Sequence, residues 1–257
     1  MSIYQHFRPE EKEFIDQVLN WRDSVEQTYA PRLTDFLDPR QQYIVNSIIG
    51  KNHDWKVSFF GGIEMAERKR AIIYPNYFTP IEDDYEITLF EIMYPEKFVT
   101  LTHPEVLGSL MGLGLKRSKF GDIFIREKSI QFLTASEIAE YIRANFVMVG
   151  RTKIQLVERP FTEILNFAES ISELNFTVSS LRIDTVLANA SRLSRQKIQS
   201  LIEQGLVKVN WAVVHSTSYE LQEGDVISAR GIGRIRLLTI GDKTKKDKWK
   251  ITVGKYK

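Results

Sequence analysis

Residues 182–210 read RIDTVLANASRLSRQKIQSLIEQGLVKVN, and this stretch decides the fold of the C-terminal part of the chain. Arg182-Ile183-Asp184 predicts the start of a short helix. Ser194 predicts the start of a second helix, because a serine hydroxyl there can accept a hydrogen bond from an amide of the first turn. Gly205 is the expected left-handed residue at its end, and a strand is expected at 207–209. The second helix has an apolar face at Ile198, Leu201 and Ile202. We therefore expect two helices packed on a small curled sheet.

The surroundings of the second helix are basic. Arg192, Arg195 and Lys197 lie around its expected start, where free amides and the helix dipole also favour an anion. Of the 35 Lys and Arg in the chain, 15 lie in residues 181–257, together with 7 of the 33 Asp and Glu, a net charge of +8. The preceding 180 residues hold the remaining 20 basic and 26 acidic residues, a net charge of −6. This uneven distribution predicts a module that binds a polyanion.

Five blocks in this region resemble the S-four domain, the RNA-binding module named after the fourth small-subunit ribosomal protein. They are Arg-x-Asp at 182–184, Ser-Arg at 194–195, Leu-Ile-x-x-Gly at 201–205, Val-x-Val-Asn at 207–210 and Gly-Asp-x-Ile at 224–227. Trp211 departs from the family, which usually has Gly after Val-x-Val-Asn. An Asn-Gly type I′ turn needs positive φ at both positions, so we expect a turn of another kind here. Trp211 then either has a structural role or offers a stacking surface to RNA.

The basic character continues to the end of the chain. Glycines around Arg230, Arg234 and Arg236 would let the backbone approach phosphate, which arginine binds bidentately. The lysine-rich run around Trp249 either contacts RNA or is a solvated hairpin. No base-reading pattern is visible, so recognition of RNA shape and backbone is expected. The predicted RNA-binding residues are Arg182, Arg192, Ser194, Arg195, Lys197, Lys208, Asn210, Arg230, Arg234, Arg236, Lys243, Lys245 and Lys246.

The pattern of the whole chain predicts an α+β protein. An N-terminal helical and αβ segment is expected at residues 1–80, with a short helix at 63–68. Residues 81–175 are expected to form a ferredoxin-like middle domain, β-α-β-β-α-β, followed by a connecting helix at 162–174. Residues 176–257 would be the S-four-type (alpha-L) RNA-binding domain.

Few residues outside the basic C-terminal part suggest a binding or catalytic role. Lys116, Arg117 and Lys119 form a second candidate RNA contact, and Gly61-Gly62 lacks the dinucleotide and P-loop patterns, which favours a structural turn. The chain has no Cys, which excludes disulfides, thiolate metal sites and a thiol nucleophile. Its four His residues show no metal spacing, so we expect no metal and no cofactor. We also predict no signal peptide, no membrane insertion and a cytoplasmic location.

The whole chain also resembles the YlmH family, bacterial proteins with a C-terminal S-four domain. The blocks that carry this resemblance are Phe60-Gly61-Gly62, Ala66-Glu67-Arg68, Leu101-x-His103-Pro104, Leu107-Gly108, Leu113-Gly114-Leu115-Lys116-Arg117, Gly121-Asp122-Ile123 and Arg230-Gly231-x-Gly233-Arg234. The resemblance implies ribosome association, a genetic neighbourhood linked to cell division, and a role on stalled large subunits that carry peptidyl-tRNA. We therefore expect a non-enzymatic protein whose partners are rRNA, tRNA and the large ribosomal subunit.

Two other functions stay open on the sequence. Pseudouridine synthases and some rRNA methyltransferases carry S-four domains, which makes an rRNA-modifying enzyme the first alternative. The chain shows no motif that resembles the one around the catalytic Asp of a pseudouridine synthase, however. Gly61-Gly62 is also a poor match to the glycine-rich loop of a methyltransferase. The second alternative is a cell-division interaction protein with incidental basic charge, in which case RNA binding would not depend on Arg195 and Arg234.

Overall fold

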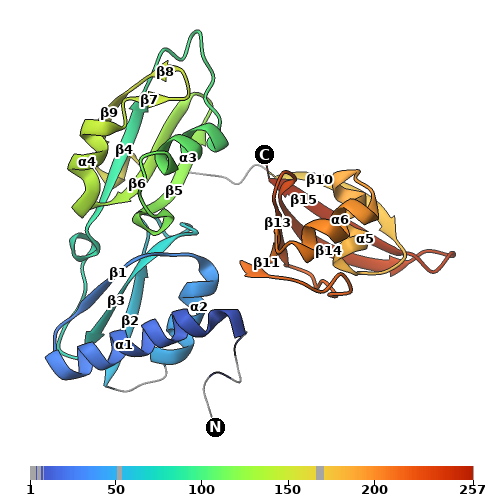
Figure 1. Ribbon diagram of the computed structural model, residues 1–257, viewed down its shortest axis with the longest axis horizontal. Helices are drawn as coiled ribbons and strands as arrows, with labels where there is room; N and C mark the ends of the chain where they lie inside the picture. Colours follow the sequence, from blue (N-terminus) through green and yellow to red (C-terminus); the bar gives the residue numbers. More distant parts are fainter. Residues whose placement is uncertain (1–3, 5–6, 8, 51–53, 166–170, 257) are drawn as a thin grey trace. The chain divides into compact units, whose positions relative to one another are not determined.

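The computed structural model describes residues 4, 7, 9–50, 54–165 and 171–256. It divides into two compact units, residues 1–167 and 168–257 (Figure 1). Helices and strands contribute to both units, which confirms the expected α+β class. Within the described ranges, no helix is both long enough and apolar enough to cross a membrane.

The first unit begins with a three-stranded sheet covered by two helices. Its elements are α1 (Lys12–Thr28), β1 (Arg32–Leu37), α2 (Pro39–Ile49), β2 (Trp55–Phe60) and β3 (Lys69–Pro75). The strand order is β1-β3-β2, and both pairs are antiparallel. Helix α2 starts at a capping box, because Asp38 accepts from the Gln41 amide and Gln41 accepts from the Asp38 amide. Both helices lie against this sheet (Figure 1), and their apolar side chains share a core with it.

The first unit continues with a four-stranded sheet and two more helices. Its elements are β4 (Ile87–Met93), α3 (His103–Met111), β5 (Phe120–Arg126), β6 (Ser129–Ala135), α4 (Ala139–Asn145), β7 (Met148–Val149), β8 (Thr152–Lys153) and β9 (Gln155–Arg159). The order is β5-β6-β4-β9 with antiparallel neighbours, and β7 and β8 form a separate hairpin. The expected succession of strands and helices is present, with that hairpin added before the last strand. The assignment to the ferredoxin-like class stays a prediction, as does the division into domains at residues 80 and 175.

Both faces of the four-stranded sheet are buried. On one face Phe90 and Phe132 belong to a core that α3 and α4 complete. On the other face Leu133 packs with Phe36 of β1, so the two sheets of this unit share a core. Gly121 lies where β5 bulges, and a Cβ at this position would come within 2.8 Å of the Phe36 ring. Glycine therefore allows β1 to approach β5 closely.

The second unit is a six-stranded sheet with two helices on one face. Its elements are β10 (Ile171–Val178), α5 (Ile183–Ser191), α6 (Arg195–Glu203), β11 (Val207–Val209), β12 (Ala212–Val213), β13 (Val226–Ala229), β14 (Gly233–Lys243) and β15 (Trp249–Tyr256). The strand order is β10-β15-β14-β13-β11-β12, antiparallel throughout. Helices α5 and α6 lie on the same face of this sheet (Figure 1). Leu187 and Ile198 of these helices share a core with Ile227 and Ile235 of the strands. We call this helix-covered side of the sheet the inner face and the opposite side the outer face.

Two expected helices are wrong. Residues 63–68 form bends and turns between β2 and β3. The connecting helix expected over 162–174 is not formed in its described part, because Phe161–Glu163 is a single 3-10 turn and β10 begins at Ile171; residues 166–170 lie outside the described residues. All eight residues of β10 pair with β15, and this long-range ladder overrides the local helical spacing.

The turn expected to be of another kind at Asn210-Trp211 is also a wrong prediction. Asn210 has φ 47° and Trp211 has φ 64°, so both central residues of the β11–β12 hairpin are left-handed, as in a type I′ turn. The Asn210 amide group holds the turn, since it donates to Asp225 at 2.8 Å and accepts from the Val226 N–H at 2.9 Å. A left-handed backbone costs a non-glycine residue about 1–2 kcal/mol, so Trp211 is strained here.

Candidate nucleic-acid interface

A buried carboxylate organises the start of the second unit. The Asp184 side chain is 0% exposed and lies in the first turn of α5. The Nη2 atom of Arg195 is 2.7 Å from its Oδ2, and the Nη2 atom of Arg182 is 3.2 Å from the same oxygen. Gln199 and Thr185 donate further hydrogen bonds, both at 3.2 Å. Asp184 thereby joins α5 to α6 and fixes two guanidinium groups, which we call the Asp184 cluster.

The two arginines of the Asp184 cluster still face solvent. The Arg182 side chain is 36% exposed and that of Arg195 is 53% exposed. Burial alone would raise the pKa of Asp184, but hydrogen bonds from Arg195, Arg182 and Gln199 outweigh burial and lower that pKa. The carboxylate is therefore charged at neutral pH and holds both arginines with their remaining N–H groups available to an anion.

The first turn of α6 adds to this cluster. The Ser194 hydroxyl accepts from the Lys197 amide at 3.3 Å, which confirms Ser194 as the N-cap. Arg192 ends α5 in a left-handed conformation with φ 58°, and its side chain is exposed, as is that of Lys197. The structure thus brings Arg182, Arg192, Ser194, Arg195 and Lys197 together on the helical side of the unit. Cations beside free helix amides form a surface suited to phosphate.

Other predicted residues lie on the outer face of the sheet. Because side chains alternate along a strand, Arg234 and Arg236 point away from the buried Ile235 and Leu237. Lys208 likewise points away from its buried neighbours in β11. The structure therefore separates the predicted residues into a helical set and an outer-face set, a division that the sequence analysis did not anticipate.

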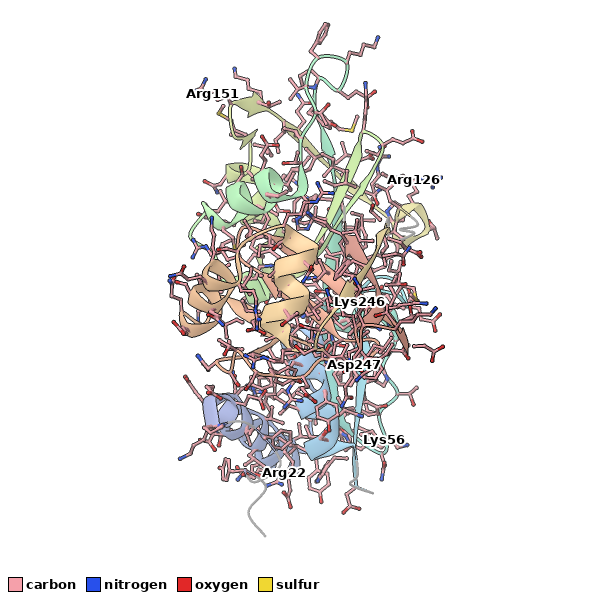
Figure 2. All side chains as sticks on the ribbon, turned by 90° about the vertical axis from the view of Figure 1, so that its right-hand side faces the viewer. Arg22, Lys56, Arg126, Arg151, Lys246 and Asp247 are labelled. Atoms are coloured by element: carbon pink, nitrogen blue, oxygen red, sulfur yellow. The ribbon has the colours of Figure 1, made fainter. Side chains whose placement is uncertain are left out.

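The remaining predicted residues of the second unit lie in turns. Arg230 is exposed in the turn between β13 and β14. The Lys243 ammonium is 2.8 Å from an Asp247 carboxylate oxygen and 5.0 Å from the centre of the Trp249 ring. Lys245 and Lys246 are exposed in the β14–β15 turn, where Lys246 and Asp247 are visible in Figure 2. The lysine run therefore forms an exposed hairpin turn, and whether it contacts RNA stays a prediction.

The second candidate contact, at residues 116–119, is not an exposed patch of three cations. Arg117 is largely buried and donates to the carbonyls of Phe120 and Gly121 at 2.6 and 3.1 Å. Burial, followed by the charge of Arg68, lowers the pKa of Arg117 to about 10. Lys119 lies 2.6 Å from an Asp35 oxygen and 2.9 Å from a Glu137 oxygen. Lys116 is exposed, but its two companions hold the first unit together.

Asp122 has a structural task in the same region. The bulge of β5 directs its carboxylate to the turns before β3, where it accepts from the Glu67 amide at 2.6 Å and the Arg68 amide at 3.2 Å. Burial, together with the charge of Glu67, raises the pKa of Asp122 to about 6. We therefore interpret the Ala66-Glu67-Arg68 and Gly121-Asp122 blocks as two sides of one packing contact.

The raised pKa of Asp122 predicts a pH dependence of stability. The folded chain keeps this proton up to about pH 6, whereas the unfolded chain releases it near pH 3.8. Stability should therefore fall as pH rises between these values, by about 3 kcal/mol at most, and then level off. Urea unfolding from about pH 4 to about pH 7 should show this fall relative to Asp122→Asn. The exposed Asp83→Asn variant should follow the wild-type curve, and a wild-type curve parallel to that of Asp122→Asn would contradict the assignment.

A further group of exposed cations lies at one end of the four-stranded sheet, which we call the distal end. Pairing of Glu91 with Gln131 and of Met93 with Gln155 brings the end of β4, the β5–β6 turn and the β7–β8 hairpin to this end. The aromatic side chain of Phe98 is 89% exposed here. The cations are Lys97, Arg126, Lys128, Arg151 and Lys153, two of which are labelled in Figure 2. They come from three separate segments, so no local spacing in the sequence could reveal them.

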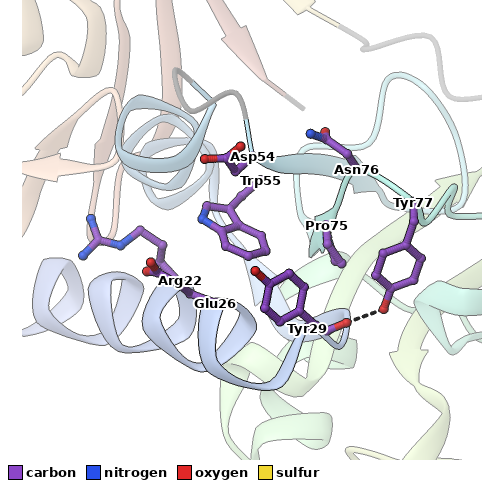
Figure 3. A pocket seen from close by; sticks show the side chains of 8 residues that line it. All are labelled: Arg22, Glu26, Tyr29, Asp54, Trp55, Pro75, Asn76 and Tyr77. Atoms are coloured by element: carbon purple, nitrogen blue, oxygen red, sulfur yellow. Dashed lines mark hydrogen bonds between the residues drawn. The ribbon is translucent and has the colours of Figure 1, made fainter.

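A hollow near the first helix has a different character. It is lined by Arg22, Glu26, Tyr29, Asp54, Trp55, Pro75, Asn76 and Tyr77 (Figure 3). The Tyr29 and Trp55 rings meet edge to face with centroids 5.7 Å apart, and the Tyr77 hydroxyl donates to the Tyr29 carbonyl. Its charges are mixed, and it contains none of the predicted RNA-binding residues. Across the described ranges, no three His, Cys, Asp or Glu side chains group as metal ligands would.

Models of known families match three successive stretches of the chain between residues 10 and 227. A family model described as "YlmH, N-terminal" matches residues 10–78. A model described as "Putative RNA-binding domain in YlmH" matches residues 80–163. The chain belongs to the YlmH family. A third model, "S4 domain", matches residues 181–227, so the expected S-four domain is confirmed where α5, α6 and the first strands after them lie.

Known relatives agree with membership of the YlmH family. The "Ribosome-associated protein quality control protein P2" of Bacillus subtilis (strain 168) is 46% identical over 256 residues, which cover 100% of this chain and 99% of that protein. A solved structure, "Cell division protein ylmH from Streptococcus pneumoniae", is 37% identical, with a TM-score of 0.56. It covers 64% of this chain and 100% of its own.

Proposed function

We propose that this YlmH-family protein binds RNA on the ribosome, with the Asp184 cluster and the start of α6 as its main contact to the phosphate backbone. The main support for this proposal is the pair of guanidinium groups that the buried Asp184 carboxylate holds in place. Exposed Arg192 and Lys197 lie beside them. Fixed cations lose little freedom on binding, so phosphate contacts formed by them are favourable. The name of the 46% identical relative, a ribosome-associated protein quality control protein, supports the ribosome as the location.

Within that function we propose the large subunit, in a state that holds a tRNA, as the partner. Structured rRNA and tRNA present phosphate arrays that an S-four domain can recognise by shape rather than by base sequence. The first unit would contribute a second contact to the same assembly. Its distal end has five exposed cations, whereas Arg117 and Lys119 are engaged within the fold.

Sedimentation through sucrose gradients tests this proposal. Full-length protein mixed with purified ribosomal subunits should sediment with the large subunit and should be released as salt is raised, since phosphate contacts weaken with ionic strength. Recovery only in the ribosome-free fractions would contradict the proposal. A crosslinking map of the bound RNA would then identify which surface of the first unit contacts RNA. Crosslinks at Arg151 and Lys153 would indicate the distal end, and crosslinks at Lys116 would indicate the other candidate contact.

We also propose that the protein acts without modifying RNA. The buried charged groups described above, Asp122, Arg117 and Asp184, each hold hydrogen bonds within the fold, which is a structural use. Mass spectrometry of rRNA incubated with the protein and S-adenosylmethionine tests for methylation, and carbodiimide labelling of the same rRNA tests for pseudouridine, which has the same mass as uridine. A new modified nucleotide would show that the protein is an enzyme.

A further inference from the structure

Trp211 combines a strained backbone with an aromatic side chain at the tip of a hairpin. Its φ of 64° is one that glycine adopts without strain. The Asn210 side chain provides the hydrogen bonds that hold the turn, so the turn itself does not require an indole at the next position. A strained residue of this kind suggests a use for its side chain.

The indole of Trp211 belongs to a group of three side chains. The guanidinium carbon of Arg234 is 5.8 Å from the centre of the Trp211 ring and 5.7 Å from that of Tyr256. These distances are those of cation–π contacts, which orient both rings and the arginine. The strand pairing of β14 with β13 and β15 places Arg234 on the outer face, so this group lies on the side of the sheet without helices.

The cations nearest this group lie on the neighbouring outward positions of the sheet, and Asp225 is the carboxylate at the turn, where it accepts from Asn210. Lys208 and Arg236 point outward from β11 and β14 beside this group and are exposed, and Lys250 lies farther along the same face of β15, opposite Thr177. At the outward positions of β10 and β15 the single carboxylate is that of Glu173, opposite Gly254. Proteins bind single-stranded nucleic acids on sheet faces of this kind, where aromatic rings stack on bases and nearby cations contact phosphates.

We propose that the outer face is a second RNA-binding surface of this unit, distinct from the Asp184 cluster, on which Trp211 stacks an unpaired base. Arg236 and Lys208 then contact the flanking phosphates, and Arg234 holds the indole in position. The unit can thus hold two RNA segments, structured RNA on its helical side and a single strand on its outer face. This proposal rests on the RNA-binding function proposed above and assigns it a further site.

The test compares stability and RNA affinity in two variants of the full chain. Trp211→Gly relieves the backbone strain, so its melting temperature should equal or exceed that of the wild type. Its affinity for a fluorescent single-stranded RNA of about ten nucleotides should fall about tenfold, because one stacking contact is lost. Trp211→Phe keeps a ring and should bind within about threefold of the wild type. Fluorescence anisotropy measures the affinities.

The outcomes separate this proposal from the general function. Unchanged affinity of Trp211→Gly would overturn it, and a lower melting temperature with unchanged affinity would assign Trp211 to packing alone. In either case, weaker binding by Arg192→Glu/Lys197→Glu would leave the helical contact standing. Failure of the wild-type protein to bind any RNA would instead contradict the proposed function itself.

Discussion

The double variant Arg192→Glu/Lys197→Glu should bind ribosomal RNA about a hundredfold more weakly than the wild type at low ionic strength. Both side chains are exposed at the junction of α5 and α6. Neither belongs to the Asp184 cluster, so their reversal should leave the melting temperature unchanged. Each lost phosphate contact should also reduce the slope of log affinity against log salt by about one. Filter binding at several salt concentrations would measure both effects.

The matched control for this experiment lies in the first unit. Arg32→Glu/Lys56→Glu makes the same change of net charge at two exposed positions of the N-terminal sheet. Its RNA affinity should stay within about threefold of the wild type, because those residues would act only through the long-range field. If the control lost as much affinity as Arg192→Glu/Lys197→Glu, net charge rather than a local site would explain the binding.

Asp184→Ala should destabilise the second unit by about 3 kcal/mol and also remove most of its RNA affinity. The substitution takes away the acceptor of hydrogen bonds from Arg182, Thr185, Arg195 and Gln199. It leaves two guanidinium groups close together without a counter-charge, so their mutual repulsion further lowers the stability of the second unit. Chemical denaturation followed by circular dichroism measures the stability.

The control for Asp184 is Asp242→Ala, at an exposed position of β14, which should change stability by less than about 0.5 kcal/mol. Because the folded pKa of Asp184 is lowered, its contribution is complete above the unfolded value and is lost as pH falls through the folded one. The stability difference between wild type and Asp184→Ala should therefore shrink below about pH 4. A difference that stayed constant under acid would contradict an ionic role for the carboxylate.

Local sequence signals predicted the helical side of the second unit well. Ser194 was identified as the N-cap of α6 from its position before an apolar face, and Gly205 is left-handed with φ 70° as expected. These features depend on residues three or four apart, which is the range that a sequence shows directly.

Features that depend on distant pairing were missed or misread. Strand β10 was interpreted as part of a helix because its partner, β15, lies more than seventy residues later in the chain. The division of the cations into two faces follows from the register of β14 with β13, which local spacing does not encode. Asp122 was read only as part of a motif, since its partners, the amides of Glu67 and Arg68, lie on another segment.

The Asn210-Trp211 turn was misjudged for a different reason. The preference for glycine in type I′ turns reflects its low backbone strain at positive φ. A fold can still impose such a turn on a residue for which a positive φ is unfavourable. Here the Asn210 side chain donates to Asp225 and accepts from the Val226 N–H, and these two hydrogen bonds hold the backbone in place. The replacement of the usual glycine by Trp211 therefore changes the side chain at this position but not the type of turn.

The position of β15 bears on how the second unit forms during synthesis. This strand follows every other strand of its sheet in the chain, yet it lies between β10 and β14. Until the ribosome has made it, β10 has no neighbour and β14 presents an open edge, which invites pairing with other chains. A nascent or truncated copy that stops before Trp249 should therefore be prone to aggregation and protease attack, whereas the first unit is already complete by then and can fold independently.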